Sequence, residues 1–243
     1  MTDHHVHIGQ FNEIYFDAYS VFQSIEETCV QTGITEVYYS STSSCRDDAE
    51  LSKVEEEIAY AQAFKSKKIV VKPYLWYIPK YAEENISVKS ALNAFDYCGI
   101  KLHPFAQKWD FENPCHKKAL EEIFECCTEN KSVLIHCGKT PETLPSRFEP
   151  FFKIFPDANV ILAHSNPVNI TIKMLKKYKN VKSDTAYSDE KDIIALMKSG
   201  VKEKVLFGTD FPLTHYFDRL LFGKKRTMNE QYIEDCRKIK LFS

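Results

Sequence analysis

The chain has 243 residues, 44% of them hydrophobic, which is enough to bury the core of one enzyme-sized domain spanning residues 1–243. Lys and Arg total 32 against 34 Asp and Glu, so the formal net charge is -2 and no basic field attracts nucleic acid or an anionic membrane. No run approaches the ~18 apolar residues that a membrane span needs.

Eight cysteines are scattered without CxxC spacing, and no apolar signal segment opens the sequence. We therefore expect free thiols, a cytoplasmic protein and a small-molecule partner, with no nucleic-acid or membrane partner. The composition leaves a homo-oligomer open.

Strand and helix patterns alternate eight times along the chain. Apolar or β-branched runs predict strands, and apolar residues at helical spacing, such as Leu51, Val54 and Ile58, predict the helices between them. The helix after the third strand has the weakest pattern, since the stretch from Tyr81 is polar. The predicted strands are 2–8, 34–42, 69–78, 98–104, 132–138, 159–166, 181–187 and 204–211.

Turn and cap residues support these boundaries. Asn113 and Asn166 each precede a proline, which predicts a capping residue before proline at the first helical position. Gly33 and Gly200 stand where helices should end. Pro73 disagrees, because it lies inside a strand and lacks an N–H, so we expect a bulge there or a strand that starts later.

Eight strands, each followed by a helix, predict a parallel sheet with right-handed crossovers that closes into a (β/α)8 TIM barrel. Such barrels carry their active sites at the C-terminal ends of the strands. Five polar residues fall near those predicted ends, although the strand assignment did not use them: His7, His103, His136, His164 and Asp210.

Three histidines and one aspartate stand in the order that builds a metal site inside a barrel: His5, His7, His136 and Asp210. Imidazole and carboxylate are preferred ligands of catalytic zinc, usually three from the protein with one position open to water. Because side chains alternate along a strand, His5 and His7 point the same way. His164 is a further candidate.

The same alternation makes predictions for neighbouring residues. His4 should point to the outer face and serve the structure, whereas Asp3 should point with His5 and orient a ligand. Asp184, at the end of the seventh predicted strand, is a candidate to orient a ligand, bind substrate or cap a helix.

Six segments, in this order over nearly the whole chain, resemble the amidohydrolase superfamily, and within it the amidohydrolase-related group that also contains decarboxylases: DHHVHIG, GIKLHP, HCG, AHSN, DTAYS and FGTDFP. The resemblance implies a distorted barrel of the amidohydrolase type that surrounds one or two divalent metals. By motif position it assigns these metals to His5, His7, His136, His164 and Asp210. A lysine on the fourth strand, here Lys101, is in the superfamily either free or carboxylated and bridging two metals.

We assign Lys101 and His103 to substrate binding, because they share a strand face and an ammonium group binds a carboxylate or carbonyl oxygen but cannot ligate a metal. A second metal held by Lys101 and His164 is the alternative. We favour one metal, with His164 as a free general acid or base. Zinc is favoured, although manganese and iron take the same ligands.

The sequence therefore predicts a metal-dependent hydrolase whose metal-activated water attacks the carbonyl of a small amide, lactone or ester, with Asp210 accepting the proton. The alternative is a nonoxidative decarboxylase of an unsaturated or aromatic acid, in which His164 protonates the carbanion. A TatD-like nuclease is disfavoured, since it would want a carboxylate in GIKLHP and a basic surface. The fourth interpretation is a nonenzymatic metal-binding barrel. We expect a substrate with a carboxylate or carbonyl group.

Overall fold

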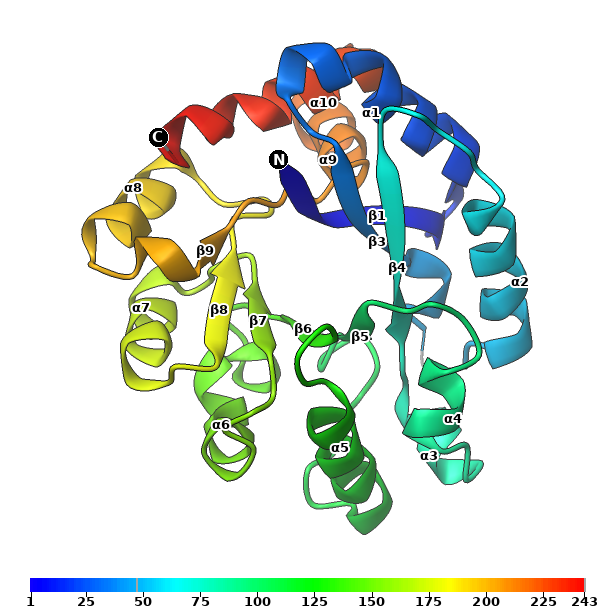
Figure 1. The fold of residues 1–243 in the computed structure, drawn as a ribbon, viewed down its shortest axis with the longest axis vertical. Helices are drawn as coiled ribbons and strands as arrows, with labels where there is room; N and C mark the ends of the chain where they lie inside the picture. The colour runs from blue at the N-terminus through cyan, green and yellow to red at the C-terminus, as the bar shows by residue number, and fades with distance from the viewer. Residues whose placement is uncertain (47, 243) are drawn as a thin grey trace.

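The computed structural model describes residues 1–46 and 48–242. In the described part of the chain the strands form one nine-stranded sheet, and the helices surround it (Figure 1). The first half contains β1 (Thr2–Phe11), β2 (Ile14–Phe16), α1 (Ala18–Thr32), β3 (Glu36–Ser41), α2 (Leu51–Gln62), β4 (Val70–Trp76), α3 (Pro79–Glu83), α4 (Val88–Leu92), β5 (Gly99–Leu102) and α5 (Pro114–Cys126). The second half contains β6 (Ser132–His136), α6 (Glu149–Ile154), β7 (Val160–Ala163), α7 (Val168–Lys177), β8 (Val181–Asp184), α8 (Glu190–Lys198), β9 (Val205–Leu206), α9 (Leu213–Phe222), α10 (Met228–Cys236) and the 3-10 helix η5 (Arg237–Phe242).

The predicted barrel is confirmed. Apart from the short strand β2, the strands pair in parallel, and each is hydrogen-bonded to the next in chain order from β1 through β3 to β9. Backbone hydrogen bonds close the ring between β1 and the segment after β9: His4 N donates to Phe207 O, Asp210 N donates to His5 O and His7 N donates to Phe211 O, at 2.7–2.9 Å. The closure brings Asp210 beside His5 and His7.

Two apolar layers hold the barrel together. The larger lies between strands and helices, where residues such as Val6, Ile100 and Leu162 are fully buried. The smaller fills the barrel interior below the strand ends and contains Tyr74, Leu134, Ile161 and Ala163. Because fully burying one Leu or Ile side chain contributes about 1.5–3 kcal/mol, these layers give the strand ends a rigid base.

A β-bulge near the start of β1 overturns two predictions. The register against β3 shifts between Asp3 and Val6, so one extra residue stands on β1 and strict alternation fails. The ring of His4 packs edge-on against Tyr38, which packs against the interior cluster, so His4 faces the inside of the barrel.

Asp3 points the other way and orients no imidazole. Its carboxylate accepts hydrogen bonds from the backbone N–H groups of His5 and Thr209, from the Thr209 hydroxyl and from the Tyr232 hydroxyl on α10. Asp3 therefore fixes the backbone that closes the barrel. Burial raises its pKa to about 7, against the effect of these hydrogen bonds.

Pro73 lies within β4, and the expected bulge is absent: the register Tyr39 to Pro73 and Ser40 to Tyr74 runs on without a shift. The carbonyl of Pro73 accepts a hydrogen bond from Cys98 N, one residue before β5 begins. The N–H and C=O groups of one strand residue point to the same side, which for Pro73 is the side of β5. Pairing between β4 and β5 begins only at Tyr74 and Gly99, so the N–H that Pro73 lacks would have had no partner strand there.

The helix ends follow the sequence with one exception. Gly33 ends α1 in the left-handed region with φ 73°, and Gly200 follows α8 with φ 79°. Asn113 caps α5 with Pro114 at the first position, as predicted. At α7 the prediction was wrong, because Pro167 itself occupies the cap in extended conformation and no side chain caps the helix.

The structure differs from the predicted elements at two places. The third helix is two short helices, α3 and α4, and β2 forms an unpredicted antiparallel hairpin with the end of β1. In the described part of the chain, none of the helices has the length and apolar character that crossing a bilayer requires.

Candidate metal centre and active site

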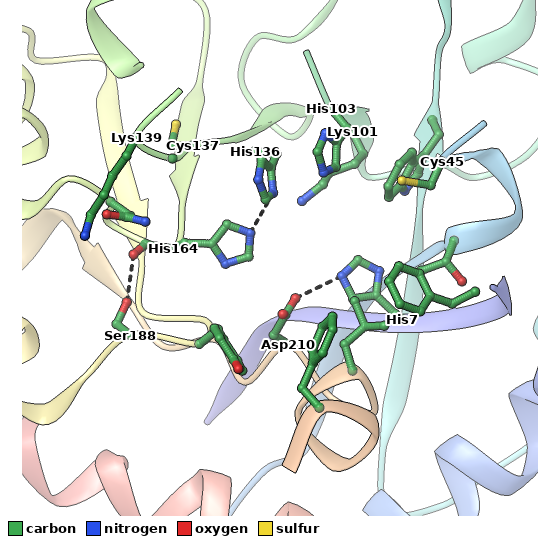
Figure 2. A pocket seen from close by; sticks show the side chains of 18 of the residues that line it. His7, Cys45, Lys101, His103, His136, Cys137, Lys139, His164, Ser188 and Asp210 are labelled. Carbon is green, nitrogen blue, oxygen red and sulfur yellow. Dashed lines mark hydrogen bonds and ion pairs between the residues drawn. The ribbon is translucent and has the colours of Figure 1, made fainter. Parts of the chain in front are cut away.

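Three predicted ligands meet where the barrel closes. Nε2 of His7 lies 3.0 Å from Oδ1 of Asp210, and Nε2 of His5 lies 3.5 Å from the same oxygen. All three side chains are almost completely buried. Figure 2 shows His7 and Asp210 facing each other, below His103, His136 and His164, which lie at or just beyond the ends of β5, β6 and β7. Ligand atoms of His5, His7 and Asp210 lie within 4.8 Å of one another, as a metal site requires.

The donor set fits a divalent ion. Asp184 Oδ2 accepts a hydrogen bond from His5 Nδ1 at 2.8 Å, and Ser40 Oγ lies 3.2 Å from His7 Nδ1. Each ring thus has a partner on Nδ1 and presents Nε2 to the centre, as metal-ligating histidines commonly do. Two ligand atoms of a tetrahedral zinc ion lie roughly 3.3–3.4 Å apart, close to the spacings about Asp210.

The protonation states suit ligation. Burial lowers the pKa of His7 and, aided by the charge of Lys101, lowers that of His5 well below its usual range, so both rings are neutral at pH 7. Burial opposes ionisation of Asp210, but the hydrogen bond from His7 and the nearby imidazoles outweigh it and lower its pKa. The three groups are therefore two neutral imidazoles and one carboxylate.

His136 and His164 form a second pair. Nδ1 of His136 lies 3.0 Å from Nε2 of His164, and neither ring belongs to the compact group of His5, His7 and Asp210. His164 instead groups with His5 and Asp184. Burial lowers the pKa of His136 well below its usual value, with the neighbouring His103 as the next cause.

The backbone at His164 is unusual and directs its ring. Ala163 packs in the interior cluster, so simple alternation would turn His164 outward, but φ is 66° at His164 and 47° at Ser165. Asp184 Oδ1 accepts from His164 N at 2.8 Å, and Ser188 Oγ donates to His164 O at 2.8 Å. Non-glycine residues hold this conformation only where the surroundings fix it, and such positions cluster at functional sites.

Hydrogen bonding also fixes the reactive atom of His164. The carbonyl of Ala186 lies 3.1 Å from Nδ1 and can only accept, so Nδ1 carries the proton. Nε2 therefore holds the lone pair when the ring is neutral. It can take a proton, or ligate a metal together with Nδ1 of His136.

Lys101 is buried within reach of the metal centre. Its Nζ donates to His5 Nε2 at 3.0 Å, and burial lowers its pKa to about 8 against the attraction of Asp184 and Asp210. His103, from the same strand face, stacks on His136 with ring centroids 3.8 Å apart. Burial lowers the pKa of His103 to about 3, so this ring is neutral.

These residues surround a cavity of about 480 Å³ at the C-terminal ends of the strands, a size that suits a small molecule. His7, Lys101, His103, His136, His164 and Asp210 all line it, whereas His5 lies behind them. The lining residues that the sequence analysis missed include four large apolar or aromatic ones: Phe11, Tyr187, Leu213 and Phe217. The i, i+4 spacing of Leu213 and Phe217, on the helix that follows Asp210, was the available signal.

Solved structures share this fold at low identity. The chain matches 4-oxalomesaconate hydratase, LigJ, from Rhodopseudomonas palustris at 14% identity and TM-score 0.54, covering 98% of this chain and 96% of that one. It matches the apo form of Metarhizium anisopliae IDCase at 13% identity and TM-score 0.53, covering 91% and 80%. Dihydrodipicolinate synthase from Bacillus clausii gives 13% identity and TM-score 0.53, covering 98% and 79%. At these identities the likeness shows the barrel fold alone.

Among curated proteins, none matches the sequence significantly. The family model described as Amidohydrolase matches residues 79–228, more than half of the chain, including Lys101, His136, His164 and Asp210 but not β1. Members of that superfamily are enzymes of hydrolase and lyase type that generally depend on a metal, in keeping with the grouping of His5, His7 and Asp210. The chain belongs to the amidohydrolase family.

Proposed function

We propose that the protein is a metal-dependent hydrolase that breaks the C–N or C–O bond at the carbonyl carbon of a small amide, lactone or ester by adding water. The observation that carries the proposal is the convergence of His5 Nε2, His7 Nε2 and Asp210 Oδ1 beside a cavity of small-molecule size. These three residues would hold the ion, with zinc favoured by the nitrogen and oxygen donor set and manganese or iron as alternatives. A bound ion would polarise a carbonyl oxygen and make a coordinated water acidic near pH 7.

Asp210 is the candidate proton acceptor. Among the described residues, its side-chain contacts to His5 and His7 all involve Oδ1, so Oδ2 is the oxygen that can take a proton. Its lowered pKa keeps the carboxylate ionised and ready to accept at neutral pH. His136 remains a candidate ligand, although it lies with His164 outside the compact group.

Lys101 and His164 are the candidate groups for the substrate. The Lys101 ammonium, 3.0 Å from His5 Nε2, can stabilise negative charge that develops on the carbonyl oxygen. His164 Nε2 faces His136 on the side opposite His7, where it can hold or donate a proton to a leaving group (Figure 2). His103, stacked on His136, lines the same side of the cavity.

A turnover panel in labelled water tests the reaction. Metal-loaded protein should hydrolyse at least one class among small amides, lactones and esters, and the acid product should contain one oxygen from H₂¹⁸O. Asp210→Asn should lose about three orders of magnitude in kcat even with metal bound, because proton transfer by a positioned group contributes about 10²–10⁴-fold. Hydrolysis without dependence on added metal would contradict the proposal.

One observation favours a second candidate, a nonoxidative decarboxylase. His164 lies outside the group of His5, His7 and Asp210 and keeps a lone pair on Nε2, so it can take up a proton from solvent there and then deliver that proton to carbon. That reaction would release carbon dioxide from an unsaturated or aromatic acid, place solvent deuterium in the product and incorporate no labelled oxygen. The same panel, extended to such acids, therefore separates the two reactions.

A further inference from the structure

We infer that the cavity selects substrates that carry an aromatic ring on the acyl or leaving-group side of the reacting carbonyl, and that Phe11, Tyr187 and Phe217 form the ring's subsite. This inference deepens the proposed function and rests on it. Its starting point is that the two sides of the cavity differ in chemical character.

The apolar side comes from the elements that also hold the metal candidates. Phe11 ends β1, four residues after His7, and Phe217 lies on α9, seven residues after Asp210. The two rings lie 5.8 Å apart at 78°, and Tyr187 lies 6.0 Å from Phe217 at 59°. Phe217 is thus inclined to both Phe11 and Tyr187, and the three rings line one wall of the cavity.

The opposite wall is mainly polar. It comes from the ends of β5, β6 and β7 and the loops after them, and presents His103, His136, Lys139 and Asn166, although Trp76 at the end of β4 adds one aromatic ring beside His103. A substrate whose carbonyl lies over His7 and Asp210 therefore meets aromatic rings on the side of β1 and α9, and hydrogen-bonding groups on the other side. An amphipathic molecule with one apolar end fits this division.

Ring geometry favours an aromatic group over an alkyl chain. Inclined aromatic side chains accept another ring edge-to-face or offset-stacked, and such pairs gain energy beyond simple burial. Phe217 is central, because it contacts Phe11 and Tyr187 together. The subsite thus depends mainly on Phe217.

Tyr187 is held at the cavity mouth at a conformational cost. Its φ is 54°, in the left-handed region, and its side chain is 46% exposed although it lines the cavity. Ser188 fixes the loop, since its N–H donates to Thr185 O and its carbonyl accepts from Lys238 Nζ at 2.7 Å. A half-exposed ring on a fixed, strained loop is the arrangement of a ligand clamp.

The test compares matched aryl and methyl substrates of whichever class turns over, such as phenyl acetate with methyl acetate. Phe217→Ala and Tyr187→Ala should each lower the aryl-to-methyl ratio of kcat/KM by about tenfold, as expected for losing one ring contact and its burial. Tyr187→Phe keeps the ring and should keep the ratio within about twofold. Phe222→Ala is the matched control on α9, because its side chain is 65% exposed and lies outside the cavity lining.

A binding assay separates this inference from the reaction. In ¹⁹F NMR titrations, 4-fluorobenzamide should bind the metal-loaded wild-type protein at least about tenfold more tightly than trifluoroacetamide, and Phe217→Ala should remove that difference. If the protein binds the aryl probe with this selectivity yet hydrolyses nothing, the proposed reaction fails and the subsite stands. If neither amide is preferred, or Phe217→Ala and Tyr187→Ala retain wild-type selectivity, the subsite is overturned whatever the reaction.

Discussion

Asp184 accepts a hydrogen bond from Nδ1 of His5 at 2.8 Å, through Oδ2. Its other oxygen accepts from the backbone N–H groups of His164 and Ala186, at 2.8 and 3.1 Å. One fully buried carboxylate at the end of β8 therefore orients a candidate ligand on β1 and also the backbone that turns the ring of His164 into the cavity. This answers the question that the sequence left open for Asp184: it neither lines the cavity nor caps α8.

Asp184→Asn should lower the affinity for the metal by about 10–100-fold, the usual cost of losing a partner that orients a ligating histidine. The amide has one oxygen and one NH₂ group. Its NH₂ group must face either the His5 Nδ1–H or the two backbone N–H groups, and the hydrogen bonds on that side are lost because two donors meet. Competition with a chromogenic chelator measures the affinity. Asp157→Asn is the control, because Asp157 is exposed before β7 and lies outside the cavity lining. Equal affinity in both variants would refute the role of Asp184.

His5→Ala, His7→Ala and Asp210→Asn should each reduce bound metal well below one ion per chain. The two alanine variants each remove a converging ligand atom and Asp210→Asn removes the negative charge of the third ligand, so the ion is held much less tightly. Elemental analysis of protein purified without chelator gives the content. His4→Ala is a matched control, since His4 faces the barrel interior beside Tyr38 but belongs to neither group of potential ligands in the described residues. Metal content that stays at the wild-type level in the three ligand variants would show that these residues do not bind the metal.

Lys101 should be a free amine, and the protein should hold one metal per chain. Native mass spectrometry reads both properties at once, since carboxylation of the lysine would add about 44 Da. Lys101→Met should therefore keep its metal while losing activity on carbonyl substrates. Two ions per chain together with the added mass would show instead that Lys101 bridges a second metal with His164.

Asp235→Asn should remove part of the stability loss that the metal-free wild-type protein shows between pH 4 and pH 8. Asp235 accepts from Thr214 and Gln231, and burial raises its pKa to about 7, although hydrogen bonds and Lys238 oppose the shift. The folded state thus binds a proton that the unfolded state releases near pH 4, so the wild type loses stability as pH rises from about 4 to about 7 and no further above that.

The size of that loss is at most about 4 kcal/mol, at about 1.36 kcal/mol for each unit of pKa. Urea unfolding at pH 4.5 and pH 8, with chelator present, should show a smaller difference between the two pH values for Asp235→Asn than for the wild type. Identical differences would mean that this carboxyl does not titrate with folding.

The sequence was informative where alternation along a strand is regular. The two-residue spacing of His5 and His7 predicted that they share a face, and GTDFP placed Asp210 at the end of the last strand. The structure brings these three together. Eight alternating strand and helix patterns were likewise enough for the barrel, because parallel strands with helical crossovers have few other ways to close.

Local backbone departures explain most of what was not predicted. The bulge that turns His4 inward and Asp3 outward leaves no mark in the residue pattern, since it depends on pairing with β3. The left-handed conformations of His164 and Tyr187 depend on hydrogen bonds from distant residues. Contacts between Phe11 and Phe217 join the two ends of the chain, and only closure of the barrel brings them together.

Anomalous diffraction from crystals of the zinc-loaded protein, measured on both sides of the zinc absorption edge, tests the metal centre most directly. We expect one strong peak bonded to His5 Nε2, His7 Nε2 and a carboxylate oxygen of Asp210, with bonds of about 2.0–2.2 Å. His136 would either add a fourth bond or remain with His164. A principal peak between His136 and His164 with none at His5, His7 and Asp210, or no peak in the cavity, would contradict the proposed centre.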